Sequence, residues 1–211
     1  MGWRGPVGVM ALAVVGSVLG YVVSGQGSDT TVGTGVAEPV AAEGPSLPVD
    51  PPTPTVADPT DPPLEPGFAM TTGSLGVGDF MITFPVPAGW RSNANATNEA
   101  KWKEPGTSNN SYVMRVEQIT SQDVTIEQAV STRVARLRVE QDGVRIRNRG
   151  ANSLEYTYRS NEGNARHSFM RWIDTDADGQ ADVEVVVHGR ESDVAGTSDL
   201  IARVSAGLRG V

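Results

Sequence analysis

Residues 144–188 read VRIRNRGANSLEYTYRSNEGNARHSFMRWIDTDADGQADVEVVVH, and their pattern decides the fold. Apolar and polar side chains alternate within four short segments, as they do in β-strands with one buried face. The segments are Val144–Arg147, Leu154–Arg159, Arg166–Ile173 and Val183–His188. The turn-rich stretch Asp174–Asp182 separates the last two segments and predicts a hairpin. Strands that follow one another through short turns predict an antiparallel sheet.

Two helices and some earlier strands complete the predicted fold. Alternation at residues 80–84 and 112–117 indicates strands, and the prolines and glycine of residues 85–89 predict a turn after the first of them. Residues 125–128, Thr-Ile-Glu-Gln, have the form of a capping box, and the apolar residues behind them recur every three or four positions up to Asp142-Gly143. A similar stripe over 200–208 predicts a closing helix. The order of two or three strands, helix, four strands and helix predicts an α+β fold, an antiparallel sheet with helices packed on it.

The first segment, 1–23, predicts a transmembrane signal-anchor. Residues 6–23 contain no charged residue and would form a helix roughly 27 Å long, close to the thickness of a hydrocarbon core. Arg4 precedes this span and the next basic residue is Arg91, so the positive-inside bias places the rest of the chain outside the cytoplasm. A cleaved secretory signal and a buried helix of a soluble protein are the alternatives.

Residues 24–67 predict a disordered, acidic, proline-rich linker. The segment has no basic residue and no aromatic residue, and its apolar residues are nearly all valine and alanine. Such a composition buries too little surface to offset the entropy of ordering the chain, and proline favours extended conformations. The folded domain is therefore expected over 68–211, held away from the bilayer by this spacer.

Composition excludes several classes of function. The chain has no cysteine, so it has no disulfide, thiolate metal site or cysteine nucleophile. Its 25 acidic residues against 17 basic ones give a net charge of −8, which disfavours nucleic acid as a partner. Motifs of serine hydrolases, zinc proteases and phosphate-binding loops do not occur in the sequence. We therefore predict that the protein is not an enzyme and has no catalytic residues.

Two aromatic motifs carry a resemblance to a known family. Residues 82–90 read ITFPVPAGW, and residues 101–106 read KWKEPG. With the element order above, they resemble the extracytoplasmic domains that end many actinobacterial membrane Ser/Thr kinases and the LpqN-type lipoproteins, which share the α/β/α sandwich of PsbP. The resemblance covers nearly all of 78–211 and implies a PsbP-like fold and a binding or accessory module outside the membrane. The chain departs from these groups because it has neither a lipid-bearing cysteine nor a kinase domain.

The loop 174–182 resembles the oxygen-ligand half of a calcium loop. Its acidic residues stand at positions 1, 3, 5 and 9, and a glycine at position 6 permits a sharp turn. The candidate ligands are Asp174, Asp176, Asp178, Gln180 and Asp182. Position 12 is Val185 where a bidentate glutamate is expected, and the flanks predict strands rather than helices. The loop is thus either a weak, structural Ca²⁺ site at a hairpin tip or an ordinary acidic turn; no other cofactor is predicted.

The two histidines and a group of arginines are further polar residues with a possible role in binding or catalysis. His167 and His188 fall in strands, where surface or hydrogen-bonded core histidines are more common than catalytic ones. Arg145, Arg147 and Arg149 alternate along one strand and predict a shared basic face, which suits either anionic wall polymers and lipid headgroups or pairing with neighbouring glutamates.

These observations together predict a membrane-tethered, extracytoplasmic, non-enzymatic binding or accessory module that recognises an envelope component or a protein partner. A calcium-stabilised structural or adhesive domain at the cell surface is the alternative, and the loop 174–182 favours it.

Overall fold

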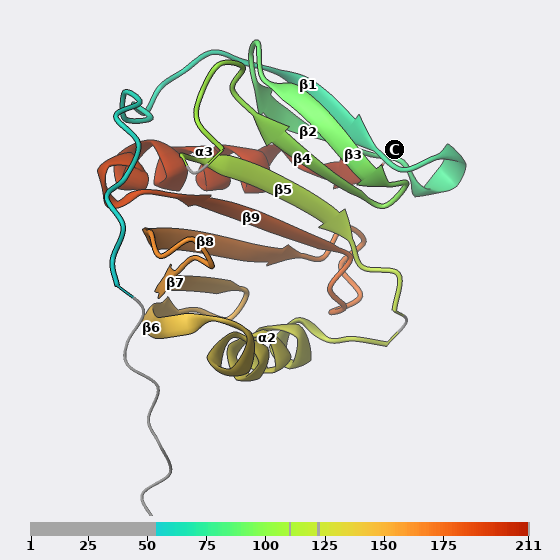
Figure 1. Ribbon diagram of the computed structural model, residues 1–211. Coiled ribbons are helices and arrows are strands. Elements are labelled where there is room, and N and C mark those ends of the chain that lie inside the picture. The colour runs from blue at the N-terminus through green and yellow to red at the C-terminus, as the bar shows by residue number, and fades with distance from the viewer. Residues whose placement is uncertain (1–53, 110, 122, 211) are drawn as a thin grey trace, which may run out of the picture. The chain divides into compact units, whose positions relative to one another are not determined.

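The computed structural model describes residues 54–109, 111–121 and 123–210 (Figure 1). All of them belong to one compact unit, Pro51–Val211. The predicted membrane span and residues 24–53 of the predicted linker lie outside the described residues. Among the helices that the structure does describe, none is long and apolar enough to cross a membrane.

The larger sheet has seven strands and is antiparallel throughout. Its strands, in spatial order, are β3 (Arg91–Ala96), β4 (Glu99–Lys103), β5 (Val113–Gln118), β9 (Val183–Gly189), β8 (Ala165–Ile173), β7 (Ser153–Arg159) and β6 (Asp142–Arg149). The four strands predicted from the alternation within 144–188 are β6 to β9, and they are adjacent. The predicted hairpin is also confirmed, because β8 and β9 pair on either side of the loop 174–182.

A second sheet of three antiparallel strands was not foreseen. It comprises β1 (Met70–Leu75), β2 (Ile82–Pro87) and β10 (Arg209–Gly210), with β2 in the middle. The short 3₁₀ turn η1 (Gly78–Phe80) connects β1 to β2. The sequence predicted a turn beginning at Pro85, but β2 continues to Pro87 before the chain turns at Gly89, whose φ is 85°.

Two α-helices pack on opposite faces of the seven-stranded sheet. Helix α2 (Ile126–Glu140) begins with the predicted capping box: the Thr125 hydroxyl accepts the Gln128 N–H, and the Gln128 side chain accepts the Thr125 N–H. Helix α3 (Val194–Gly207) follows the 3₁₀ turn η2 (Glu191–Asp193) and closes the domain. The fold is thus mixed α+β and mostly antiparallel, as predicted.

Alternation along the central strands builds a separate core on each face. In β9, Val183, Val185 and Val187 point toward α3, while Val186 points toward α2. The α2 core adds Trp172, and the α3 core adds Trp102, which meets Phe84 edge-to-face at a ring-centroid distance of 5.1 Å. The tryptophan motif of residues 101–106 is therefore part of the core.

Residues 54–67, which the sequence assigned to the linker, contact the domain along their length; we call them the strap (cyan in Figure 1). The Asp58 carboxylate accepts a hydrogen bond of 2.5 Å from Arg166. Leu64 is buried and lies against Gly196 at the start of α3, where an added Cβ would come within 2.0 Å of the Leu64 carbonyl oxygen. The folded part of the chain therefore begins before residue 68.

Truncation of Leu64 tests whether the strap contributes to stability. We expect Leu64→Ala to lower the free energy of unfolding by about 2–3 kcal/mol, because the side chain is buried in the core on the α3 face. The exposed neighbour Glu65 provides the matched control, and Glu65→Ala should change stability by less than about 0.5 kcal/mol. Urea unfolding of both variants makes the measurement. Equal stability of the two variants would show that the strap does not stabilise the fold.

Candidate functional site

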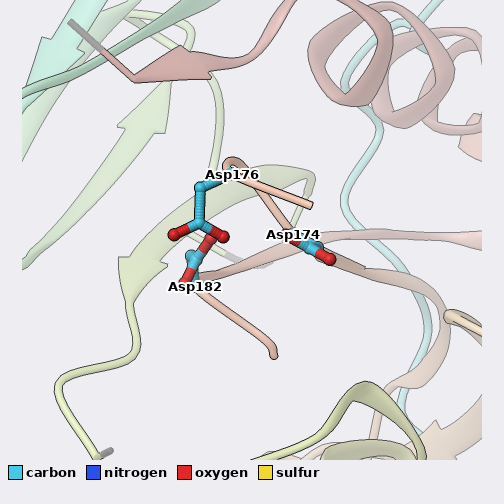
Figure 2. A group of neighbouring side chains, drawn as sticks. All are labelled: Asp174, Asp176 and Asp182. Atoms are coloured by element: carbon cyan, nitrogen blue, oxygen red, sulfur yellow. The ribbon is translucent and has the colours of Figure 1, made fainter. Parts of the chain in front are cut away.

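Three of the five predicted calcium ligands come together at the tip of the β8–β9 hairpin. Asp174, Asp176 and Asp182 each offer a carboxylate oxygen, and these oxygens lie within 4.8 Å of one another. Figure 2 shows the three side chains on the loop, with the carboxylates of Asp176 and Asp182 next to each other. The turn places them together because Ala177 and Gly179 have positive φ angles of 66° and 89°.

Asp178 is not part of this group, and the side chain of Gln180 is bound to neighbouring backbone. The Asp178 carboxylate accepts the backbone N–H of Gln180 at 2.8 Å. The side-chain oxygen of Gln180 accepts the backbone N–H of Asp123 at 3.0 Å, which ties the loop to the segment that leads into α2. The backbone N–H of Ala181 adds a bond of 2.9 Å to the Val124 carbonyl. The loop is therefore fixed at its base by neighbouring backbone.

The electrostatics of the loop differ from one carboxylate to the next. Backbone N–H groups, chiefly that of Gly179, outweigh partial burial and hold the pKa of Asp174 below its ordinary value. The N–H of Asp178 also lowers the pKa of Asp176. Burial and the charges of Asp178 and Asp182 outweigh it, so the Asp176 pKa is raised. Part of this rise comes from repulsion between close carboxylates, which a cation would relieve.

The two histidines lie in different surroundings. His167 in β8 sits between two carboxylates: its Nε2 is 2.8 Å from Glu155 Oε1, and its Nδ1 is 3.3 Å from Glu191 Oε2. His188 in β9 pairs in register with Ser168 of β8 and is partly buried. Burial, with the charges of Arg166 and Arg115, lowers the pKa of His188 to about 4. His188 is thus neutral at pH 7.

Four arginines line a cleft of about 290 Å³ near the β6 edge of the sheet, which we call the arginine cleft. Its lining includes Arg145 and Arg147 of β6, Arg159 of β7, Arg166 of β8, Thr157, Glu191 and the strap residue Thr55. Helix α3 packs on β9, β8 and β2. The two arginines of β6 that line the cleft, Arg145 and Arg147, are exposed. The register gives the reason for their orientation, since Val144 and Ile146 face the α2 core and the alternating Arg145 faces the other way.

The structure corrects the expectation that Arg145, Arg147 and Arg149 share one face. The pairing of β6 with β7 shifts between Ile146 and Asn148, which interrupts the alternation along β6. Arg149 therefore reaches α2, where it donates a hydrogen bond of 2.9 Å to the Ser131 hydroxyl. A bulge of this kind has no clear signature in the sequence.

The charges in the arginine cleft are only partly neutralised. Arg166 is 4% exposed and pairs with Asp58, and Arg159 donates to the Thr55 hydroxyl at 3.2 Å. Within the part of the chain that the structure describes, neither Arg145 nor Arg147 has an ion pair. Glu191 provides the one acidic side chain in the described lining.

A larger cleft of about 450 Å³ lies between the strap and the loop that follows β4. Asp61, Leu64 and Phe68 line one side, and Glu104 and Tyr112 line the other. The Tyr112 hydroxyl donates to the Glu104 carboxylate, and its ring stacks on Trp90 at 5.7 Å. Burial together with Glu104 raises the pKa of Tyr112. Trp90, the last residue of the motif 82–90, thus supports this wall of the cleft.

Sequence reasoning did not find the contribution of the strap to either cleft. Thr55 and Asp58 stand in a proline-rich stretch with no periodic pattern, so nothing local indicates that they contact a sheet. The one available signal was Leu64, an isolated large apolar residue among prolines.

No protein-family model matches the chain, and no curated protein matches it in sequence.

The shifted pKa of His188 predicts a pH dependence of stability. Its pKa in the folded chain is below the ordinary value of 6.5, so the unfolded chain binds the proton more tightly. The associated stability is present above pH 6.5 and is lost as the pH falls toward 4. Between pH 7 and pH 5 we expect a loss of about 2 kcal/mol that is absent in His188→Gln, measured by urea unfolding at each pH. Identical pH profiles for the two proteins would contradict this assignment.

Proposed function

We propose that the chain is a membrane-tethered, extracytoplasmic binding module that recognises a component of the cell envelope and catalyses no reaction. The arginine cleft carries this proposal. It lies on a rigid antiparallel sheet, it is lined by exposed and partly neutralised charge, and the described end of the spacer forms part of its wall. Ligand sites are typically preformed clefts in which a few convergent polar groups fix the orientation of the ligand.

The environments of the histidines support a binding role over catalysis. His167 is held between two carboxylates, and His188 is neutral and packed into the sheet beside Ser168. A general base needs access to a substrate proton, and neither ring lines one of the two clefts described above.

The N-terminal sequence and the resemblance support the location. An uncharged span after Arg4 and an acidic, proline-rich spacer suit a domain held outside the membrane. The resemblance to LpqN-type and PsbP-like extracytoplasmic domains supports the same location outside the membrane. The proposal includes a PsbP-like α/β/α sandwich as the fold.

Binding to isolated envelope fragments tests the proposed function. Purified full-length chain in mild detergent should co-sediment with envelope fragments of the cells that make it, and excess unlabelled chain should displace the labelled chain. Retention that does not saturate would contradict a binding module. Turnover of a small-molecule panel that is lost in His167→Ala or His188→Ala would contradict a non-enzymatic role.

A calcium-stabilised structural or adhesive domain is the second candidate function. The observation that favours it is the group of three carboxylate oxygens within 4.8 Å on the β8–β9 loop. Calcium prefers such oxygen ligands, and backbone carbonyls or water can complete its shell. Extracellular calcium sites commonly have dissociation constants of about 10⁻⁴–10⁻³ M.

Thermal unfolding with calcium separates the two candidates. With a dissociation constant of about 10⁻⁴ M, about 10 mM Ca²⁺ should stabilise the folded chain by about 2.7 kcal/mol, a rise in Tm of very roughly 5–11 °C. Asp176→Asn should abolish the rise. The exposed Asp79 lies outside the loop, and Asp79→Asn should retain it. An unchanged Tm in wild type would leave the loop as an acidic turn.

A further inference from the structure

We infer that the arginine cleft binds a phosphate ester of a small polyol, such as a glycerol phosphate group. This inference rests on the proposed function and names the class of ligand that the binding module would take.

The positive charge of the exposed arginines favours an anionic ligand in the cleft. Arg145 and Arg147 leave β6 two positions apart, line the same cleft, are exposed, and have no ion pair within the described residues. Two guanidinium groups on one cleft present fixed forks of donors that match the tetrahedral oxygens of phosphate. Arg159 also lines the cleft and is held against Thr55.

Arg166 is the buried arginine of the cleft, and its hydrogen bonds hold it in place. Arg166 is 4% exposed, and its Nη1 donates at 2.5 Å to both the Asp58 carboxylate and the Ala165 carbonyl. Its position is therefore set before any ligand binds, and its charge is offset by Asp58. The positive charge that remains for a ligand lies with Arg145 and Arg147 of β6.

The size of the cleft and the carboxylate of Glu191 favour a phosphate ester of a polyol over a larger or more highly charged ligand. A volume of about 290 Å³ lies at the small end of ligand pockets and suits a single headgroup-sized molecule rather than a folded macromolecule. Glu191 is exposed on the cleft, and its Oε2 lies 3.3 Å from His167 Nδ1. A carboxylate there repels a second anionic group but accepts hydrogen bonds from hydroxyls. Phosphate at the arginines and hydroxyls at Glu191 satisfy both requirements.

Calorimetric titration of the full chain in non-ionic detergent tests the inference, with glycerol 1-phosphate as the probe. We expect saturable binding to wild type, and binding at least tenfold weaker to the double variant Arg145→Gln/Arg147→Gln. The matched control is Arg136→Gln/Arg138→Gln, which removes the same charge from exposed positions on α2 and should bind within twofold of wild type. Unchanged thermal unfolding of the double variant establishes that it is folded.

Glu191 gives an independent test of the polyol part. Wild type should bind glycerol 1-phosphate more tightly than inorganic phosphate, and Glu191→Ala should remove this difference. Equal affinity of wild type for the two probes would overturn the polyol assignment. No binding at about 10 mM probe, or equal weakening in both double arginine variants, would overturn the inference as a whole.

Two further probes distinguish a lipid from a soluble source of the same group. Dihexanoyl phosphatidylglycerol and glycerophosphoglycerol share the phosphodiester, and only the first has acyl chains. Tenfold tighter binding of the first supports a lipid headgroup, whereas equal binding supports a soluble or polymeric ester. Envelope binding that survives in Arg145→Gln/Arg147→Gln would overturn the cleft assignment alone. Glycerol phosphate binding without envelope retention would overturn the proposed function alone.

Discussion

Arg190 and Asp193 form a buried ion pair that connects three parts of the chain. Arg190 is 2% exposed and Asp193 is fully buried, and Arg190 Nη2 donates to Asp193 Oδ1 at 2.7 Å. Arg190 Nε donates to the other Asp193 oxygen, Oδ2, at 2.8 Å. The Nη1 and Nη2 groups of Arg190 also donate to the backbone carbonyls of Pro59, Asp61 and Pro62, and Asp193 accepts the N–H of Leu64. Burial alone raises the Asp193 pKa, but these hydrogen bonds outweigh it and lower the pKa. Loss of one partner of such a pair typically costs about 3–5 kcal/mol.

The sequence predicts those elements whose signal is local. Strands β6 to β9 alternate between apolar and polar residues over much of their length, and α2 begins at a capping box formed by four consecutive residues. Strands β1 and β3 have no such signal, since Met70–Leu75 and Arg91–Ala96 are mostly polar. The third strand of the second sheet, β10, pairs with β2, which lies far earlier in the chain. No local sequence pattern indicates this contact. Proline within β2 also indicated a turn where the chain remains extended.

The candidate site follows the same division. The aspartate spacing of 174–182 is local, and it correctly brings Asp174, Asp176 and Asp182 together. Asp178 is not part of this group although it belongs to the same loop, and the Gln180 side chain accepts the backbone N–H of Asp123, a contact that spacing alone does not reveal. The arginine cleft joins β6, β7, β8 and the strap, so only the register of the sheet and the path of the strap define it. The alternation in β6 predicted a face rich in arginine. The bulge after Ile146 determines which of these arginines line the cleft.

The position of the arginines at the β6 edge has a structural role as well as a chemical one. An unpaired edge strand tends to recruit further strands, and exposed charge with a bulge opposes such pairing. That role alone requires only repulsion at the edge, which arginines on either face would supply. It does not require two arginines to converge with Thr157 on one cleft, or the strap to place Thr55 against Arg159. The strap thereby fixes a wall of the cleft and neutralises Arg166 through Asp58, so the charge that remains open is confined to one small volume.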